Sequence, residues 1–274
     1  MAEIRVLTTD VLVIGCGLAG LLTSLEAKKK GCDVIAIDKG IIGNDCATVG
    51  AKQIAATGPW SSEDDSPEVH FEDTIKSGCY INDEKLTRQL VNRIGSVIID
   101  LQKIGMPFSR DETGQSISVV GPSAGHSKPR SIYFSDITGK MLIDTIYAEC
   151  RRRRIRMYSE HIALELIKGE NGIAGALVFD LTSGEIILIR AKATVIATGG
   201  IGRLYELTSN PAQSTGDGIA LAMRAGADLM DLEFVQFYPC TVLYPQGIRG
   251  MNLNSQYYGA RLYNSEGERF MSKY

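Results

Sequence analysis

The N-terminal part of the chain alternates between short apolar runs and one mixed stretch. An apolar run that begins at Val11 predicts a β-strand, the stretch after Gly20 predicts a helix, and a second apolar run that ends at Asp38 predicts another strand. The first strand leads into the glycine-rich turn Gly15-Cys16-Gly17-Leu18-Ala19-Gly20. This order predicts a βαβ unit with parallel strands.

Helical spacing dominates the middle of the chain. It predicts one helix over Asp83 to Lys103, with Gly105 as its stop signal, and a second over Met141 to Arg154. The apolar residues that carry the first prediction are Leu86, Leu90, Ile94, Val97, Ile98 and Leu101. The intervening segment from Gly121 to Ser135 is rich in Gly, Ser and Pro and is predicted to be a loop.

Two segments ahead of these helices are predicted to be irregular. The segment from Gly40 to Gly58 is rich in small residues, and a loop of this length inside a compact domain is usually functional. The segment from Trp60 to Glu72 is polar and acidic, which predicts a surface excursion.

From Ile155 onward the pattern changes to β. Short strands are predicted over Ile155 to Tyr158 and His161 to Ile167, and a hairpin is predicted over Ile173 to Arg190. A separate buried strand is predicted over Ala193 to Thr198, and a helix of small residues begins at the turn Thr215-Gly216-Asp217-Gly218. A βαβ unit, helices, a β-meander and one more strand differ from the regular alternation of a nicotinamide-binding domain.

Composition and charge narrow the class of protein. The chain has 274 residues, 44% of them hydrophobic and 22% charged, and a formal net charge of -3 that gives no reason to expect nucleic acid as partner. No apolar stretch is long enough to insert in a membrane and no signal peptide is visible, which predicts a cytoplasmic protein, or one peripheral to the cytoplasmic side of a membrane complex. The run Arg151 to Arg154 is predicted to be a solvated helix end, with a docking patch as the alternative.

Cysteine spacing argues against a metal centre within this chain. The six cysteines are far apart and form no CxxC pair, so no metal site is predicted and all six are interpreted as reduced thiols.

The glycine-rich turn has the features of a dinucleotide-binding motif. Gly15 permits a sharp turn, Gly17 permits close approach of a pyrophosphate, and Gly20 lets the helix lie close to the sheet. Asp38 follows Gly20 at about the 20-residue spacing of a carboxylate that binds ribose hydroxyls. The alternative is a glycine turn without a ligand.

Six ordered motifs resemble one family. The glycine turn is followed by GMPFSR (105–110), ATGG (197–200), TGDG (215–218), DLEFVQFYP (231–239) and NSEGERFM (264–271). Together they resemble the flavoprotein subunit of succinate dehydrogenase and fumarate reductase, a family with L-aspartate oxidase and the adenylylsulfate reductase flavoprotein as relatives. The resemblance implies the N-terminal half of such a flavoprotein. It implies an α/β fold in which a Rossmann-like FAD-binding domain with a parallel sheet and a β-meander (residues 1–240) precedes the start of a capping domain (241–274).

The resemblance also implies FAD and a set of residues that would contact it. One of these residues, Asp217, has the alternative role of N-cap for the helix that follows it, and the two roles are compatible. The implied cofactor-binding residues are Gly15, Gly17, Leu18, Ala19, Gly20, Asp38, Lys39, Gly43, Asn44, Asp45, Cys46, Ala51, Lys52, Gln53, His161, Ile162, Ala163, Thr198, Gly199 and Asp217.

The chain departs from the family at the flavin and substrate positions. Cys46 stands where members with covalent flavin carry histidine, so non-covalent FAD is predicted, with a Cys46–flavin bond as the alternative. Tyr238 replaces a substrate histidine, and Phe108 matches an aromatic residue that would position substrate over the flavin or, alternatively, pack in the core. Asn252, Leu253 and Gln256 stand where dicarboxylate enzymes carry a Thr-Glu pair and an Arg. A different organic acid as the substrate is therefore an open alternative.

Three functions follow from these patterns. The first is an FAD-dependent oxidoreductase subunit that passes hydride between an organic acid and flavin N5, and electrons to an iron–sulfur partner. The second is an FAD-binding electron-transfer or scaffold half of a split flavoprotein that is inactive without its second half. The third, an NAD-dependent dehydrogenase, is favoured only by the glycine turn.

Overall fold

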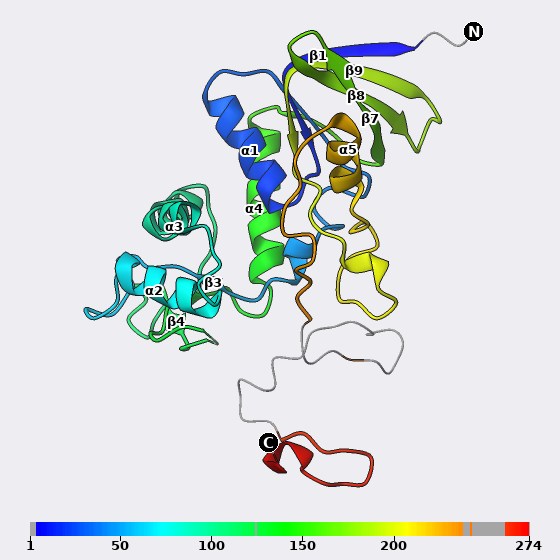
Figure 1. Cartoon of the computed structure of the whole chain (residues 1–274). Coiled ribbons are helices and arrows are strands. Elements are labelled where there is room, and N and C mark those ends of the chain that lie inside the picture. The colour runs from blue at the N-terminus through cyan, green and yellow to red at the C-terminus, as the bar shows by residue number, and fades with distance from the viewer. Residues whose placement is uncertain (1–3, 124, 238–241, 243–260, 274) are drawn as a thin grey trace.

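A six-stranded mixed sheet organises the molecule (Figure 1). The computed structural model describes residues 4–123, 125–237, 242 and 261–273. The strand order is β6-β2-β1-β9-β8-β7. The strands are β1 (Arg5–Ile14), β2 (Val34–Ile37), β6 (Arg156–Tyr158), β7 (His161–Gly169), β8 (Gly172–Asp180) and β9 (Ile186–Ile196).

The sheet is parallel on one side and antiparallel on the other. β6, β2, β1 and β9 run parallel, whereas β8 and β7 form the predicted antiparallel meander. β2 and the end of β1 from Leu12 to Ile14 are buried on both faces, as their apolar runs predict, whereas the start of β1 is largely exposed. Val13 packs in a core with α1 (Leu18–Lys29) and α4 (Thr138–Arg152), while Leu12 packs in a second core with residues of β7, β8 and α5 (Asp217–Ala225).

One strand was divided wrongly by the sequence pattern. β9 runs without interruption from Ile186 to Ile196, so the predicted separate strand from Ala193 is the second part of the same strand. Its first part pairs with both β8 and β1, and the rest pairs with β1 alone. Arg190 and Lys192 interrupt the apolar pattern because their side chains are exposed, not because the strand ends. The end of the strand is also less buried than predicted, since Ala193 and Ile196 are exposed.

A second lobe contains α2 (Pro67–Ser77), α3 (Glu84–Lys103) and a small antiparallel sheet (Figure 1). The small sheet has the order β3-β5-β4, with β3 (Ile54–Ala55), β5 (Ser131–Ile132) and β4 (Val119–Val120). α3 confirms the predicted helix, but Leu86 and Leu90 are exposed, because the buried face carries Thr87, Val91, Ile98 and Leu101 instead.

The segment from Trp60 to Glu72 is only in part the predicted surface excursion: residues 62–64 are exposed, but the segment then begins α2 and carries buried side chains. Ser66 caps α2 by accepting a hydrogen bond from Val69 N, and Pro67 is the first helical residue. Trp60, His70 and Phe71 are buried. The predicted loop 121–135 likewise contributes β5.

Short 3-10 helices complete the described elements. They are η1 (Ala47–Gly50), η2 (Gly202–Leu204) and η5 (Phe270–Lys273). At the end of α4, Arg152 and Arg153 pair with Glu149, and Arg152 is largely exposed, in agreement with a solvated helix end. Within the described ranges, no helix is long and apolar enough to cross a membrane.

Candidate functional site: a dinucleotide pocket at the strand ends

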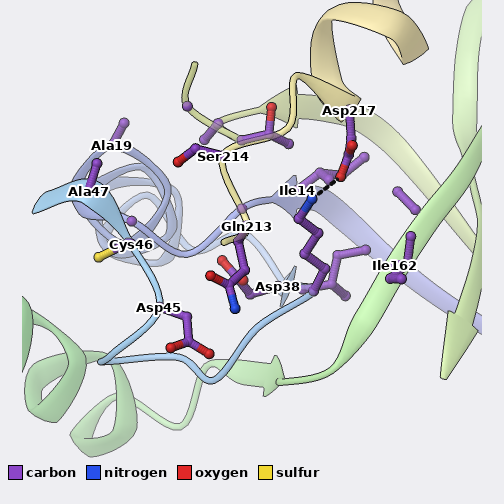
Figure 2. Close-up of a pocket in the computed structure, with 18 of the residues that line it drawn as sticks. Ile14, Ala19, Asp38, Asp45, Cys46, Ala47, Ile162, Gln213, Ser214 and Asp217 are labelled. Carbon is purple, nitrogen blue, oxygen red and sulfur yellow. Dashed lines mark hydrogen bonds and ion pairs between the residues drawn. The ribbon is translucent and has the colours of Figure 1, made fainter. Parts of the chain in front are cut away.

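A cavity of about 230 Å³ lies where β1, β2 and β9 end (Figure 2). The glycine turn and Asp38 form one side, Cys46 to Thr48 form another, and His161 to Ala163 at the start of β7 form a third. Residues 197–199 after β9 and Gln213, Ser214 and Asp217 close the remaining side. Ligands of open α/β sheets bind at this edge, outside the carboxyl ends of the strands.

The glycine turn is shaped by close backbone contacts. Gly15 has a φ of +101°, and a Cβ there would lie 2.4 Å from Ala197 O. A Cβ on Gly20 would lie 1.8 Å from Gly15 O, so only glycine lets α1 start this close to β1. Gly17 is the N-cap of α1 and makes no side-chain cap hydrogen bond. The first turn of α1 therefore presents backbone N–H groups and positive dipole charge to the cavity.

Backbone N–H groups of two segments, the glycine turn and the residues after β2, orient the carboxylate of Asp38. One carboxylate oxygen accepts from Cys16 N at 2.6 Å, and the other accepts from Gly40 N at 2.8 Å. Each oxygen keeps a lone pair for a further donor, because a carboxylate accepts about four hydrogen bonds. Asp38 is thus held in place to accept hydroxyl groups from a ligand in the cavity.

Lys39 and Asp217 form an ion pair at the cavity wall, drawn as the dashed line at Asp217 in Figure 2. Lys39 Nζ lies 2.5 Å from Asp217 Oδ2 and 2.5 Å from Thr215 Oγ1. Partial burial raises the pKa of Asp217, but hydrogen bonds from Lys39 and Thr215 outweigh burial and leave this pKa below its usual value. Asp217 is the first residue of α5 and Gly216 is its N-cap, so the predicted N-cap role of Asp217 is wrong.

The start of β7 is fixed by His161. Its Nδ1 lies 2.7 Å from Ser159 O, which assigns the proton to Nδ1, since a carbonyl oxygen can only accept. The His161 ring stacks beside Tyr158, with the ring centroids 5.2 Å apart. Ile162 and Ala163 then line the cavity with small apolar surface.

Most of the sequence-predicted cofactor residues meet at this cavity. Those that line it are Gly15, Gly17, Leu18, Ala19, Asp38, Lys39, Asp45, Cys46, His161, Ile162, Ala163, Thr198, Gly199 and Asp217. Those outside its lining are Gly20, Gly43, Asn44, Ala51, Lys52 and Gln53. Gly20 acts from behind the turn, through helix packing.

Residues 51–53 instead attach the loop to α4. Thr138 Oγ1 donates to Lys52 O at 2.5 Å, and Gly139 N donates to Ala51 O at 2.8 Å. Gln53 Oε1 accepts from Ser123 Oγ at 3.2 Å. Their role at a cofactor stays a prediction.

Four cavity-lining residues, two after Cys46 and two before the TGDG motif, were absent from the predicted set of cofactor-binding residues. Ala47 and Thr48 belong to η1, directly after Cys46. Gln213 and Ser214 come immediately before the TGDG motif. The motif was the available signal for them, but which neighbouring side chains face the cavity depends on the fold of the preceding turn.

The predicted substrate residues do not line the cavity in the described part of the chain. Phe108 is buried in the main core with Met106 and Ile117, which favours its alternative as a core residue. Its role at a substrate stays a prediction. Tyr238 lies outside the described residues, as do Asn252, Leu253 and Gln256.

The cysteine thiols that the structure describes are unpaired. Cys46 lines the cavity and is partly buried, and burial raises its pKa. Cys16, behind the glycine turn, is fully buried, and burial raises its pKa further. Across the described ranges no cluster of His, Cys, Asp and Glu could hold a metal ion.

Comparison with known proteins identifies the ligand class. The family model described as "FAD binding domain" matches residues 10–274. The chain belongs to this family. The glycine turn, the N-terminus of α1 and the oriented Asp38 fit a dinucleotide such as FAD. The cavity is smaller than the roughly 300–1,000 Å³ of pockets that enclose drug-sized ligands.

The relatives include the enzymes that the sequence motifs resemble. One subunit of the CoM/CoB fumarate reductase of Methanothermobacter marburgensis is 37% identical over 97% of this chain and 49% of the relative. The succinate dehydrogenase flavoprotein subunit of Coxiella burnetii is 31% identical over 100% of this chain and 47% of the relative. The resemblance is therefore confirmed, and L-aspartate oxidase is also among the relatives.

A solved structure confirms the fold. The structure of quinol-fumarate reductase with menaquinol molecules matches 99% of this chain and 46% of its own with a TM-score of 0.90 and 28% identity. The chain spans about half the length of the relatives it matches.

Proposed function

We propose that this chain is the FAD-binding part of an oxidoreductase of the succinate dehydrogenase and fumarate reductase type. Bound FAD would supply the redox chemistry, taking or giving hydride at N5 against an organic acid and passing electrons to an iron–sulfur partner. The observation that carries the proposal is one cavity that collects the glycine turn, Asp38, the start of β7 and Asp217 from distant parts of an FAD-binding domain.

The lining suggests how the parts of FAD would be held. The N-terminus of α1 at Gly17 would bind the pyrophosphate, Asp38 the adenosine ribose, and the strand start at His161 the adenine end. The loop 43–58 would lie along the flavin. We propose that FAD is bound non-covalently, that residues 1–240 form the cofactor domain, and that 241–274 begin a capping domain. A cytoplasmic location, peripheral to a membrane complex, fits this function.

The proposal is tested with the purified chain. It should carry flavin absorption bands, and acid precipitation should release FAD into solution. Fumarate should reoxidise the dye-reduced protein. A colourless protein that binds NADH instead would contradict the FAD proposal, and flavin that stays with the precipitate would contradict the non-covalent attachment.

A second candidate is an FAD-binding electron-transfer or scaffold half that needs a second polypeptide. One observation favours it. Among the described residues, the cavity is lined by residues predicted to bind the cofactor, whereas Phe108, a residue predicted to position the substrate, is buried in the core. An isolated chain that holds FAD without turnover, and gains fumarate turnover when a second polypeptide is added, would support this candidate over the first.

A further inference from the structure

Thr215 lies behind the cavity wall and joins two residues that line it. Lys39 Nζ lies 2.5 Å from both Thr215 Oγ1 and Asp217 Oδ2, and Thr215 Oγ1 lies 2.7 Å from Asp217 Oδ1. An ammonium group only donates, so the hydroxyl accepts from Lys39 and its single proton goes to Asp217. The three groups form a closed ring of hydrogen bonds with every direction fixed. Lys39 and Asp217 are in the cavity lining, whereas Thr215 is not.

Carboxylates outnumber cations in the described lining of the cavity. Asp38, Asp45 and Asp217 line it, against the single ammonium group of Lys39. Backbone N–H groups stabilise the first two, because Asp38 accepts from Cys16 and Gly40 and Asp45 accepts from Ile41 N at 2.8 Å. Asp217 instead depends on the side chains of Lys39 and Thr215. Pairing with the Lys39 ammonium offsets the charge of Asp217, so the cavity repels an anionic diphosphate less while the pair is formed.

We propose that Thr215 is a positioning residue for the bound dinucleotide: its hydroxyl holds Lys39 and Asp217 in one arrangement that lets the cavity accept an anionic diphosphate. The inference rests on the proposed function, since it concerns the same cavity. The hydroxyl is needed because the side chains of Lys39 and Asp217 are 23% and 37% exposed, and a partly exposed ion pair contributes little without a third group.

The local backbone makes Thr215 suited to this role. Gly216 has a φ of +80°, and a Cβ on it would lie 2.8 Å from Ile201 Cγ2. This left-handed turn directs the Thr215 hydroxyl at the carboxylate two residues later, just before α5 begins. Lys39 approaches from the end of β2 on a flexible stem and has no comparable constraint of its own.

The test removes the hydroxyl without touching the ligand. Thr215→Val keeps the side-chain shape, and Thr215→Ser keeps the hydroxyl. The matched control is Thr113→Val, because Thr113 Oγ1 donates to Asp111 Oδ1 at 2.7 Å across an exposed turn outside the cavity. The measurement is the rate at which FAD leaves the holoprotein, followed as recovered flavin fluorescence after dilution.

We expect Thr215→Val to release FAD about tenfold faster, since a hydrogen bond to a charged group is commonly equivalent to a factor of this size. Thr215→Ser should stay within about twofold of the unmodified protein, and Thr113→Val should match it. Thr215→Ala removes the same hydroxyl and replaces the valine variant if circular dichroism shows that the latter is misfolded.

Two results would overturn the inference. The first is unchanged release from the variants without the hydroxyl, and the second is release from Thr215→Ser as fast as from Thr215→Val, which would assign the effect to side-chain shape. Failure of the proposed function is distinguishable, because the unmodified protein would then contain no FAD at all.

Discussion

Among the single residues, His70 shows how burial creates pH dependence. It lies on α2 with 2% of its surface exposed, and its Nδ1 has no hydrogen-bond partner. Arg130, His126, Asp65 and Asp73 face it. Burial lowers the pKa of His70 to about 4, with Arg130 and His126 acting in the same direction and the two carboxylates opposing them. The imidazole is therefore neutral in the folded protein.

Stability should consequently fall on acidification. The unfolded chain binds a proton at His70 below about pH 6.5, whereas the folded protein does so only near pH 4. We predict that His70 takes up to about 3 kcal/mol from the free energy of unfolding between these limits. Denaturant unfolding at several pH values should show a shallower loss in His70→Gln over this window. Parallel profiles for both proteins would show that His70 does not titrate as described.

Among the helices and strands, one buried arginine ties the second lobe together. Arg130 precedes β5 and is fully buried. Its guanidinium makes a bidentate pair with Asp65, at 2.7 and 3.1 Å, and donates to Asp73 of α2 at 2.7 Å. Ser127 donates to Asp73 through both its backbone N and its hydroxyl. These bonds hold the segment before β5 against α2 and against the residues just before that helix.

We predict that Arg130→Met lowers the free energy of unfolding by roughly 3–5 kcal/mol, because it leaves the buried carboxylate of Asp65 without its partner. Lys103→Met is the control, since Lys103 pairs with Asp100 on the exposed surface of α3, where loss of a pair costs at most about 1 kcal/mol. Chemical denaturation measures both. Equal losses in the free energy of unfolding from the two substitutions would mean that burial of the Arg130 ion pair does not increase its contribution to stability.

The N-terminus of α4 positions the loop 43–58 through Gly139. A Cβ on Gly139 would lie 1.8 Å from Thr48 O and 2.9 Å from Ala51 N. We predict that Gly139→Ala displaces η1 and weakens FAD binding by about tenfold or more, because Thr48 lines the cavity. Lys140→Ala, one residue along the same helix, should leave FAD affinity within about twofold. Titration with FAD measures both, and an unaltered affinity in Gly139→Ala would separate α4 from the cofactor site.

Across the molecule as a whole, the features predicted correctly are those that local patterns encode. The glycine turn, α3 and the meander follow from short-range periodicity and backbone requirements. Two errors arose where tertiary packing overrides that pattern. Exposed Arg190 and Lys192 divided β9, and the polar sequence around Ser66 concealed a buried Trp60 and Phe71.

Contacts between distant segments could not be predicted from spacing. Lys39 meets Thr215 across 176 residues, and Arg130 meets Asp65 across 65. The family motifs supplied Lys39 and Asp217 as single cofactor residues, but only the fold shows that they pair. Gln213 and Ser214 reach the cavity for the same reason, because β9 and the turn after it return the chain to the glycine motif.

Both proposals depend on the binding of FAD at the glycine turn, which a titration of the flavin-free chain with FAD measures directly. The matched variant is Gly17→Val, which adds side-chain atoms where a Cβ would already lie 3.6 Å from Cys46 Cβ. We expect saturation at one FAD per chain and an affinity lower by about tenfold or more in Gly17→Val. Equal affinities of the two proteins for FAD, or no saturable binding by the unmodified chain, would show that FAD does not bind there.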